Sequence, residues 1–173
     1  MDDLRYPIGE FEMPPSLTPK QRVSALAAIA AAPAELRAAL TGLSEAQLDS
    51  PYRPEGWTIR QVVHHLPDSH MNSYIRFKLG LTENEPTIGV YNEKLWSELP
   101  DAKDPIEASL RLLTALHERW VSLLETIDDE TWGRFIHHPE WGRLRLDQLL
   151  ALYDWHSRHH VAHVRSLRDR QGW

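Results

Sequence analysis

Seven of the ten histidines in this chain fall within two short segments. The segment RQVVHHLPDSHMNSY contains His64, His65 and His70, and the segment YDWHSRHHVAH contains His156, His159, His160 and His163. Neutral imidazole is the commonest protein ligand for zinc, copper, iron and nickel. Two histidine-rich segments so far apart in the sequence therefore predict a metal ion held between two elements of the fold.

The second segment offers two histidine pairs at helical spacing. Each residue of an α-helix advances about 100°, so residues four positions apart lie about 40° apart on one face. His159 and His163 meet this condition, and so do His156 and His160. Either pair could chelate one ion. Neither pair is the HExxH signature of zinc proteases, because no glutamate follows the first histidine of either pair.

A third ligand is expected from the first segment. His64 and His65 point about 100° apart on a helix, so only one of them is expected to face the ion, and spacing does not choose between them. Three protein ligands leave at least one coordination position open, which is typical of a catalytic metal site. The unused histidines are expected to hold the ligands by hydrogen bonds or to lie at the surface. Outside the two segments, structural or solvent-facing roles are predicted for His117, His137 and His138.

Composition limits the kinds of site and partner. The chain has no cysteine, which excludes disulfides and thiolate metal sites. Its net charge of −6 opposes a long phosphate-binding surface, so no nucleic acid partner is expected. Arg165, Arg168 and Arg170 are interpreted as charges that offset the dipole at a helix end. The sequence shows neither the basic region and apolar stretch of a signal peptide nor an apolar run long enough for a membrane span, so a cytoplasmic location and no membrane partner are predicted. The length of the chain predicts one domain, 1–173.

Four long helices are predicted, and they imply an all-α four-helix bundle. Capping patterns at Thr18 and Thr58 predict helices to about Leu43 and Gly80. Asp104 and Asp147 are expected to begin the other two long helices. Prolines interrupt the first two helices: Pro33 predicts a kink or two consecutive helices, and Pro67 predicts a kink beside His65.

The connections are expected to be short or irregular. A turn of helix is predicted after Ser44, a loop over SPYRPEGW, a loop over 82–90 and a short helix over 92–99. The turn signal HPEWG lies between the short runs RFIH and RLRL, which favours a small hairpin or an extended loop over 132–146.

Both histidine segments carry a resemblance to a known family. GWTIRQVVHHLPDSHMNSYIRFKL together with YDWHSRHHVAHV resembles the DinB/YfiT proteins, and YPIGEFE, LDSPYRPEGW and EKLWSEL are similar to the YfiT branch. The resemblance implies a four-helix bundle, commonly homodimeric, that binds zinc or nickel through three histidines. It identifies His65, His159 and His163 as the metal ligands, with zinc favoured. Pro67 departs from the family pattern, in which a helix-forming residue is usual.

Three functions remain open for such a site. A metal held by neutral histidines lowers the pKa of a bound water towards about 7, which predicts hydrolysis of a small-molecule substrate. The YfiT branch is described as metal-dependent hydrolases, whereas other members of the family transfer low-molecular-weight thiols such as bacillithiol. The third alternative is a helical interaction module stiffened by a structural metal.

Further candidates lie near the histidines, although no catalytic base is assigned. Asp68 follows His65 by three residues and could hold a ligand or act as a base, or it could be a surface residue. Trp57, Trp96 and Trp155 lie near the site segments, in either a pocket or the core. Substrate carboxylates could be bound by basic residues that are otherwise solvated helix charges: Arg60, Arg76 and Lys78.

Overall fold

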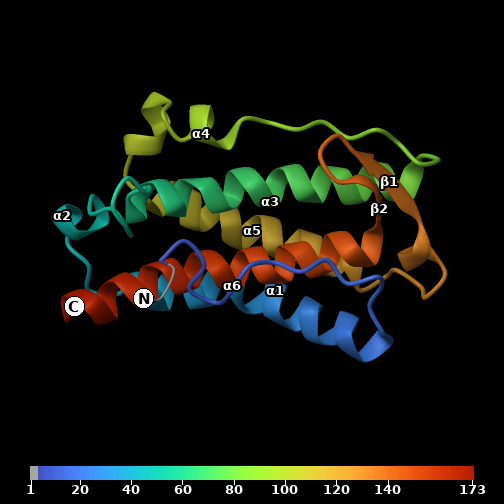
Figure 1. Ribbon diagram of the computed structural model, residues 1–173, viewed down its shortest axis with the longest axis horizontal. Coiled ribbons are helices and arrows are strands. Elements are labelled where there is room, and N and C mark those ends of the chain that lie inside the picture. The colour runs from blue at the N-terminus through green and yellow to red at the C-terminus, as the bar shows by residue number, and fades with distance from the viewer. Residues whose placement is uncertain (1–3) are drawn as a thin grey trace.

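The computed structural model describes residues 4–173, and four long helices dominate it (Figure 1). They are α1 (Pro19–Leu40), α3 (Ile59–Thr82), α5 (Glu107–Leu124) and α6 (Leu146–Gln171). Helices α1 and α3 each pack against both α5 and α6, so α1 and α3 lie diagonally across the bundle. The predicted all-α four-helix bundle is therefore confirmed.

Shorter elements join the long helices. They are α2 (Glu45–Leu48), α4 (Glu93–Trp96), the 3-10 turns η1 (Pro100–Lys103) and η2 (Thr131–Gly133), and the strands β1 (Phe135–His138) and β2 (Gly142–Arg145). The strands pair antiparallel, with Phe135 opposite Arg145 and His138 opposite Gly142, which confirms the predicted hairpin. The hairpin lies at one end of the bundle, and α2 and the C-terminus lie at the other (Figure 1).

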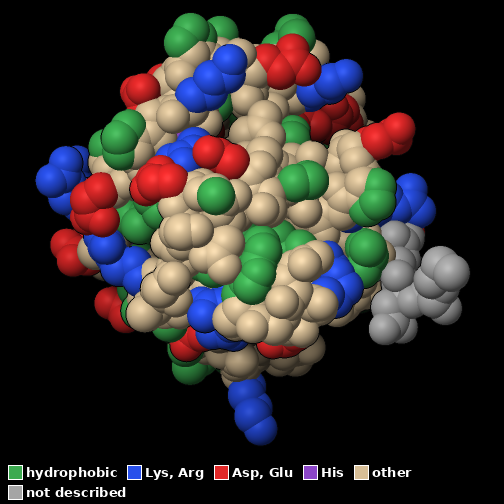
Figure 2. Space-filling view, turned by 90° about the vertical axis from the view of Figure 1, so that its left-hand side faces the viewer, with side chains coloured by type: hydrophobic (Ala, Val, Ile, Leu, Met, Phe, Trp, Pro, Cys, Tyr) green, Lys and Arg blue, Asp and Glu red, His purple; other side chains and the backbone are tan. Residues whose placement is uncertain are grey.

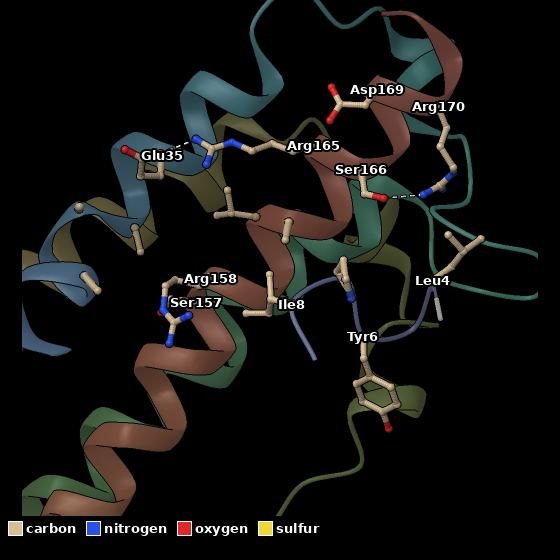
Figure 3. Close-up of a pocket in the computed structure, with 16 residues that line it drawn as sticks. Leu4, Tyr6, Ile8, Glu35, Ser157, Arg158, Arg165, Ser166, Asp169 and Arg170 are labelled. Atoms are coloured by element: carbon tan, nitrogen blue, oxygen red, sulfur yellow. Dashed lines mark hydrogen bonds and ion pairs between the residues drawn. The ribbon is translucent and has the colours of Figure 1, made fainter. Parts of the chain in front are cut away.

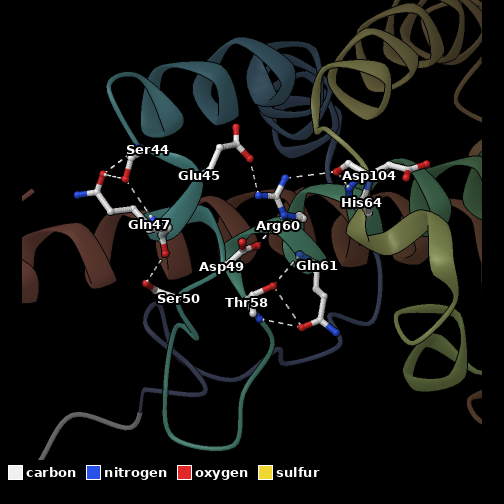
Figure 4. Close-up of polar contacts among 11 residues, drawn as sticks. Ser44, Glu45, Gln47, Asp49, Ser50, Thr58, Arg60, Gln61, His64 and Asp104 are labelled. Atoms are coloured by element: carbon white, nitrogen blue, oxygen red, sulfur yellow. Dashed lines mark hydrogen bonds and ion pairs between the residues drawn. The ribbon is translucent and has the colours of Figure 1, made fainter.

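Three helices begin where the sequence places them. Thr18, Ser44 and Thr58 each accept a hydrogen bond from the backbone N–H three residues later, and the glutamine at that position bonds back to the cap. Figure 4 shows two of these capping boxes. A capping side chain stabilises a helix by about 1 kcal/mol, and the interaction is local, so it can be predicted from sequence.

The expected starts at Asp104 and Asp147 are wrong. Helix α5 begins at Glu107, and the Asp104 carbonyl instead accepts hydrogen bonds from His64 and Arg60. Asp147 lies inside the first turn of α6, where its buried carboxylate pairs with Arg145 and accepts the backbone N–H of Leu17. The Asp104 backbone carbonyl and the Asp147 carboxylate each make at least one contact distant in sequence, which a local capping pattern does not contain.

The two internal prolines do not divide their helices. Pro33 lies inside α1 and Pro67 inside α3, and both helices continue past them, so the alternative of two consecutive helices at Pro33 is wrong. A proline inside a helix removes one backbone donor and crowds the carbonyl four residues earlier, and together these effects cost about 3 kcal/mol. Both proline rings are buried in the bundle, and that packing opposes the cost.

Helix α1 is long and apolar enough, by length and composition alone, to cross a membrane, which the absence of a long continuous apolar run did not predict. Its alanines raise its hydropathy, and one face is buried against α5 and α6. A core helix of a bundle passes the same test. Figure 2 views the end of the molecule that carries α2, where basic and acidic side chains are interspersed.

Two groups of buried apolar side chains form the core. The group nearer the hairpin includes Phe77, Trp120, Leu146 and Tyr153. The second group includes Leu36, Leu66, Leu113 and Val161. In three of the four long helices, a histidine falls in the sequence between members of the two groups: His70 in α3, His117 in α5 and His156 in α6. A layer of imidazoles therefore separates the two apolar groups.

Candidate metal centre

Helices α3 and α6 bring the two histidine segments together. The Nε2 atoms of His65 and His156 are 3.2 Å apart, and the ring centroids of His65 and His160 are 4.9 Å apart. The predicted meeting of one α3 histidine with the α6 segment is therefore observed. Residues more than ninety positions apart are brought into contact by the packing of these two helices.

The candidate ligand nitrogens form two overlapping groups. One contains His65, His156 and His160, and the other contains His159, His160 and His163; within each, the nitrogens lie within 4.8 Å of one another. The three ligands implied by the family resemblance are divided between the groups, with His65 in one and His159 and His163 in the other. His160 belongs to both groups, whereas spacing placed it only with His156.

The imidazoles of the cluster are neutral at pH 7. Burial lowers the pKa of His65 to about 4, that of His163 to about 4 and that of His159 to about 3. Burial and the neighbouring histidines also hold the pKa values of His156 and His160 well below 6.5. A neutral imidazole keeps one lone pair, which is the form that binds a metal ion.

One nitrogen in the cluster has no protein partner. Nδ1 of His159 is buried and makes no hydrogen bond with the described residues. An unpaired buried polar atom costs about 1 to 3 kcal/mol, so it normally has a ligand, an ion or a water. This nitrogen, together with an all-imidazole donor set, fits a divalent transition metal such as zinc or nickel.

Aromatic rings hold the three predicted ligands. Trp155 stacks on His159 with centroids 4.2 Å apart, Tyr52 stacks on His163 at 3.9 Å, and Trp57 lies 4.7 Å from His65. Trp57 and Trp155 therefore line the histidine cluster. Tyr52 was not predicted as a site residue, although it lies in the same loop, SPYRPEGW, as Trp57.

Arg5 and Tyr6, in the described segment before α1, contact the α6 histidines. His163 donates its Nε2–H to the carbonyl of Arg5 at 3.0 Å, and the Tyr6 ring lies 6.0 Å from that of His159. The bond to a carbonyl requires the proton on Nε2, which leaves Nδ1 of a neutral His163 as its lone-pair nitrogen. Sequence reasoning gave this segment no role at the site.

His64 belongs to the scaffold of the bundle. Its Nδ1 lies 2.7 Å from the Ser109 hydroxyl. Its Nε2 lies 3.0 Å from the carbonyl of Asp104, which Figure 4 shows beside it, so both nitrogens are engaged. These contacts point His64 towards α5. His65 is the one that faces α6.

The histidines outside the two segments differ in environment. His137 is half exposed and pairs with Glu85 at 3.3 Å, and His138 is buried and accepts the backbone N–H of Glu140. Both fit the predicted structural or surface roles. His117 is buried and contacts His70, so it is joined to the first histidine segment.

The basic candidates have structural partners. Arg60 donates to Asp49 and Glu45, as Figure 4 shows. Arg76 is buried and donates to the Gly89 carbonyl and the Tyr153 hydroxyl. These two arginines are thus engaged within the fold and are not solvated helix charges. Lys78 is exposed, as expected for such a charge.

Asp68 lies beside His65 in a small cavity. The cavity is lined by His64, His65 and Asp68 from α3, by Trp96 of α4 and by Asp101 of η1, among others. Burial and the charge of Asp101 raise the pKa of Asp68, whereas His64 lowers it. Asp68 is therefore a half-buried carboxylate next to a predicted ligand and not a fully solvated surface residue.

A larger cavity, of about 820 Å³, lies on another face of α6 (Figure 3). It is lined by the N-terminal segment, α1 and α6, and Arg165 forms an ion pair with Glu35 across it. The residues that α6 gives to this cavity, such as Ser157, Val161 and Arg165, alternate with the clustered histidines. The two features therefore occupy different faces of one helix.

Comparison with known proteins gives concordant matches. Proteins of Bacillus cereus and Bacillus thuringiensis named "Putative metal-dependent hydrolase" are 51% identical over 173 residues, which is the full length of each chain. The solved structure of YfiT from Bacillus subtilis, titled "a probable metal-dependent hydrolase with an unusual four-helix bundle topology", aligns with a TM-score of 0.95 at 49% identity over 98% of both chains. Residues 28–164 match the description "DinB superfamily". The chain therefore belongs to the DinB superfamily.

Proposed function

We propose that this protein is a metal-dependent hydrolase whose divalent metal is held by His65, His159 and His163. The observation that carries the proposal is a buried cluster of neutral imidazoles containing one nitrogen, Nδ1 of His159, that lacks a protein partner. The names of the relatives support metal-dependent hydrolysis. The ligand set rests on the family resemblance and on the i,i+4 spacing of His159 and His163. Zinc is preferred and nickel is the alternative.

When bound, the metal supplies a Lewis acid that can activate water near neutral pH. The chain's own residues prepare the site for it. Tyr52, Trp57 and Trp155 confine the imidazoles and exclude bulk water from one side of the cluster. Exclusion of water strengthens the electrostatic interactions made there. Three protein ligands would leave a position for water or substrate.

The proposal is tested by assaying the zinc-loaded protein on activated esters and amides. The assay is run with and without a chelator, and with and without bacillithiol plus an electrophile. Hydrolysis that requires metal, needs no thiol and disappears in His159→Ala is expected. Thiol-dependent conjugation that disappears in His159→Ala would instead assign a thiol transferase. If no reaction occurs and metal removal lowers only thermal stability, the protein is an interaction module with a structural metal.

The assembly and compartment expected from the sequence remain predictions. The family resemblance implies a homodimer, which light scattering coupled to gel filtration would detect. A cytoplasmic location is checked by fractionating the cells that make the protein.

A further inference from the structure

A line of hydrogen-bonded imidazoles leads from the metal centre to the backbone of α1. Nδ1 of His156 lies 3.0 Å from Nε2 of His70, and Nδ1 of His70 lies 2.7 Å from Nε2 of His117. Nδ1 of His117 lies 2.7 Å from the carbonyl oxygen of Ile29. Three helices, α6, α3 and α5, each give one histidine to this line.

The carbonyl at the end of the line determines where every proton lies. A carbonyl oxygen only accepts, so His117 must carry its proton on Nδ1. A neutral His117 then has a lone pair on Nε2, and His70 must donate to it from Nδ1. The same step places the lone pair of His70 on Nε2 and the proton of His156 on Nδ1. All three rings are fixed as Nδ1–H tautomers.

The three tautomers are fixed only if the imidazoles are uncharged, and the surroundings of these histidines keep them neutral. His70 and His117 are buried between α1, α3, α5 and α6. Burial lowers the pKa of His117 to about 4, and burial together with the adjacent histidines lowers that of His70 well below 6.5. Trp120 and Tyr153 lie edge-on to His70 and shield it.

We propose that His70 and His117 are positioning residues that lock His156 as its Nδ1–H tautomer, so that Nε2 of His156 is a permanent hydrogen-bond acceptor facing the metal centre. The line ends on the Ile29 carbonyl, which has no proton to give. The line therefore fixes the direction of each hydrogen bond and does not conduct protons out of the site. The locked tautomer does not depend on the metal. Its use at the site rests on the function proposed above.

The acceptor nitrogen, Nε2 of His156, lies 3.2 Å from Nε2 of His65. In the metal-free protein, His65 satisfies it by donating an Nε2–H. If His65 bound a metal through Nε2, that nitrogen would no longer donate to His156. Nε2 of His156 would then accept from a group that carries a hydrogen-bond donor, such as water or a substrate hydroxyl or amide N–H, and would orient its hydrogen.

The test is a long-range ¹H–¹⁵N correlation spectrum of the metal-free full-length protein at pH 7. The spectrum distinguishes a protonated ring nitrogen from one that carries a lone pair. We expect His70, His117 and His156 each to be protonated at Nδ1 and unprotonated at Nε2. A wild-type spectrum with the proton of His156 on Nε2 overturns the proposal, and this measurement requires no variant.

Two variants test the mechanism of locking. His117→Leu removes both hydrogen bonds, so the nitrogen shifts of His156 should move towards values averaged over two tautomers. His117→Gln can donate to Ile29 and accept from His70, so the wild-type shifts should be retained. Unchanged His156 shifts in a folded His117→Leu protein would show that the line does not lock the tautomer.

Zinc titration of the wild-type protein separates this inference from the proposed function. On zinc binding, the shifts of His65 should change, whereas Nε2 of His156 should keep the shift of an uncoordinated acceptor. A metal-coordinated shift at Nε2 of His156 would make this residue a ligand and overturn its role as an acceptor. Failure of zinc to bind at all would contradict the proposed function and leave the metal-free tautomer measurement valid.

Discussion

His64 and His65 are adjacent in the sequence, but their side chains contact different parts of the bundle. His64 uses both nitrogens to join α3 to Ser109 and Asp104, whereas His65 faces the α6 histidines. The 100° step of a helix predicts that the two residues diverge, but it does not predict which one faces inward. That choice depends on how α3 is rotated against its neighbours, which is a property of the whole bundle.

His64→Ala should weaken the fold and leave metal binding intact. The substitution removes two hydrogen bonds and leaves Ser109 and Asp104 without their imidazole partner, so the free energy of unfolding should fall by about 1 to 3 kcal/mol. Urea unfolding of the metal-free protein measures this loss. A variant as stable as wild type would show that the contacts of His64 contribute little.

Trp155 should hold His159 in its binding orientation. Its indole stacks on the imidazole at 4.2 Å and 19°. Trp155→Ala removes this support, and we expect zinc affinity to fall by about 10-fold, the lower end of the range for loss of a group that orients a ligand. Trp155→Phe keeps an aromatic face and should bind zinc nearly as well as wild type. Equal affinities of the alanine variant and wild type in a competition titration would refute the effect.

At the scale of the helix, local capping explains the starts of α1, α2 and α3. Thr58 begins the helix that carries His65, and its hydroxyl accepts the backbone N–H of Gln61 at 3.1 Å. Thr58→Ala should lower the free energy of unfolding by about 1 kcal/mol. Ser24→Ala, at an exposed position inside α1, is the matched control and should change stability by less than about 0.5 kcal/mol. Equal effects of the two variants in urea unfolding would contradict the capping argument.

The elements that sequence predicted well are those set by neighbouring residues. The capping boxes and the HPEWG turn act within four or five positions, and the structure confirms them. The predicted starts at Asp104 and Asp147 were wrong. The Asp147 carboxylate is engaged by Arg145 and by the distant Leu17. Helix α5 begins three residues after Asp104, whose backbone carbonyl accepts hydrogen bonds from α3. The line from His156 through His70 and His117 to Ile29 also escaped prediction, because it joins four helices and has no sequence signature.

At the scale of the whole molecule, burying many neutral histidines makes stability depend on pH. An unfolded histidine has a pKa near 6.5, whereas burial lowers that of His117 to about 4. Between these pH values the unfolded chain binds protons that the folded chain does not. The free energy of unfolding should therefore fall as the pH decreases from about 6.5 to 4, and this contribution is constant above that range.

Urea unfolding of the metal-free protein between pH 8 and pH 4.5 measures this dependence. Each buried histidine contributes at most about 1.4 kcal/mol per pH unit below pH 6.5. The pKa values of the site histidines and of His70 are lowered in the same direction, so the slope should exceed that of one residue. A midpoint that does not change between pH 7 and pH 5 would show that these imidazoles are not buried in the neutral form.

The central claim is that one divalent metal lies between α3 and α6 on His65, His159 and His163. Zinc content per folded protein, measured by mass spectrometry on dialysed samples, tests it most directly. His65→Ala, His159→Ala and His163→Ala should each lose most of the zinc, whereas His64→Ala should keep the wild-type content. Wild-type zinc in folded His159→Ala and His163→Ala, with loss in His156→Ala and His160→Ala, would contradict the claim and place the metal on His65, His156 and His160.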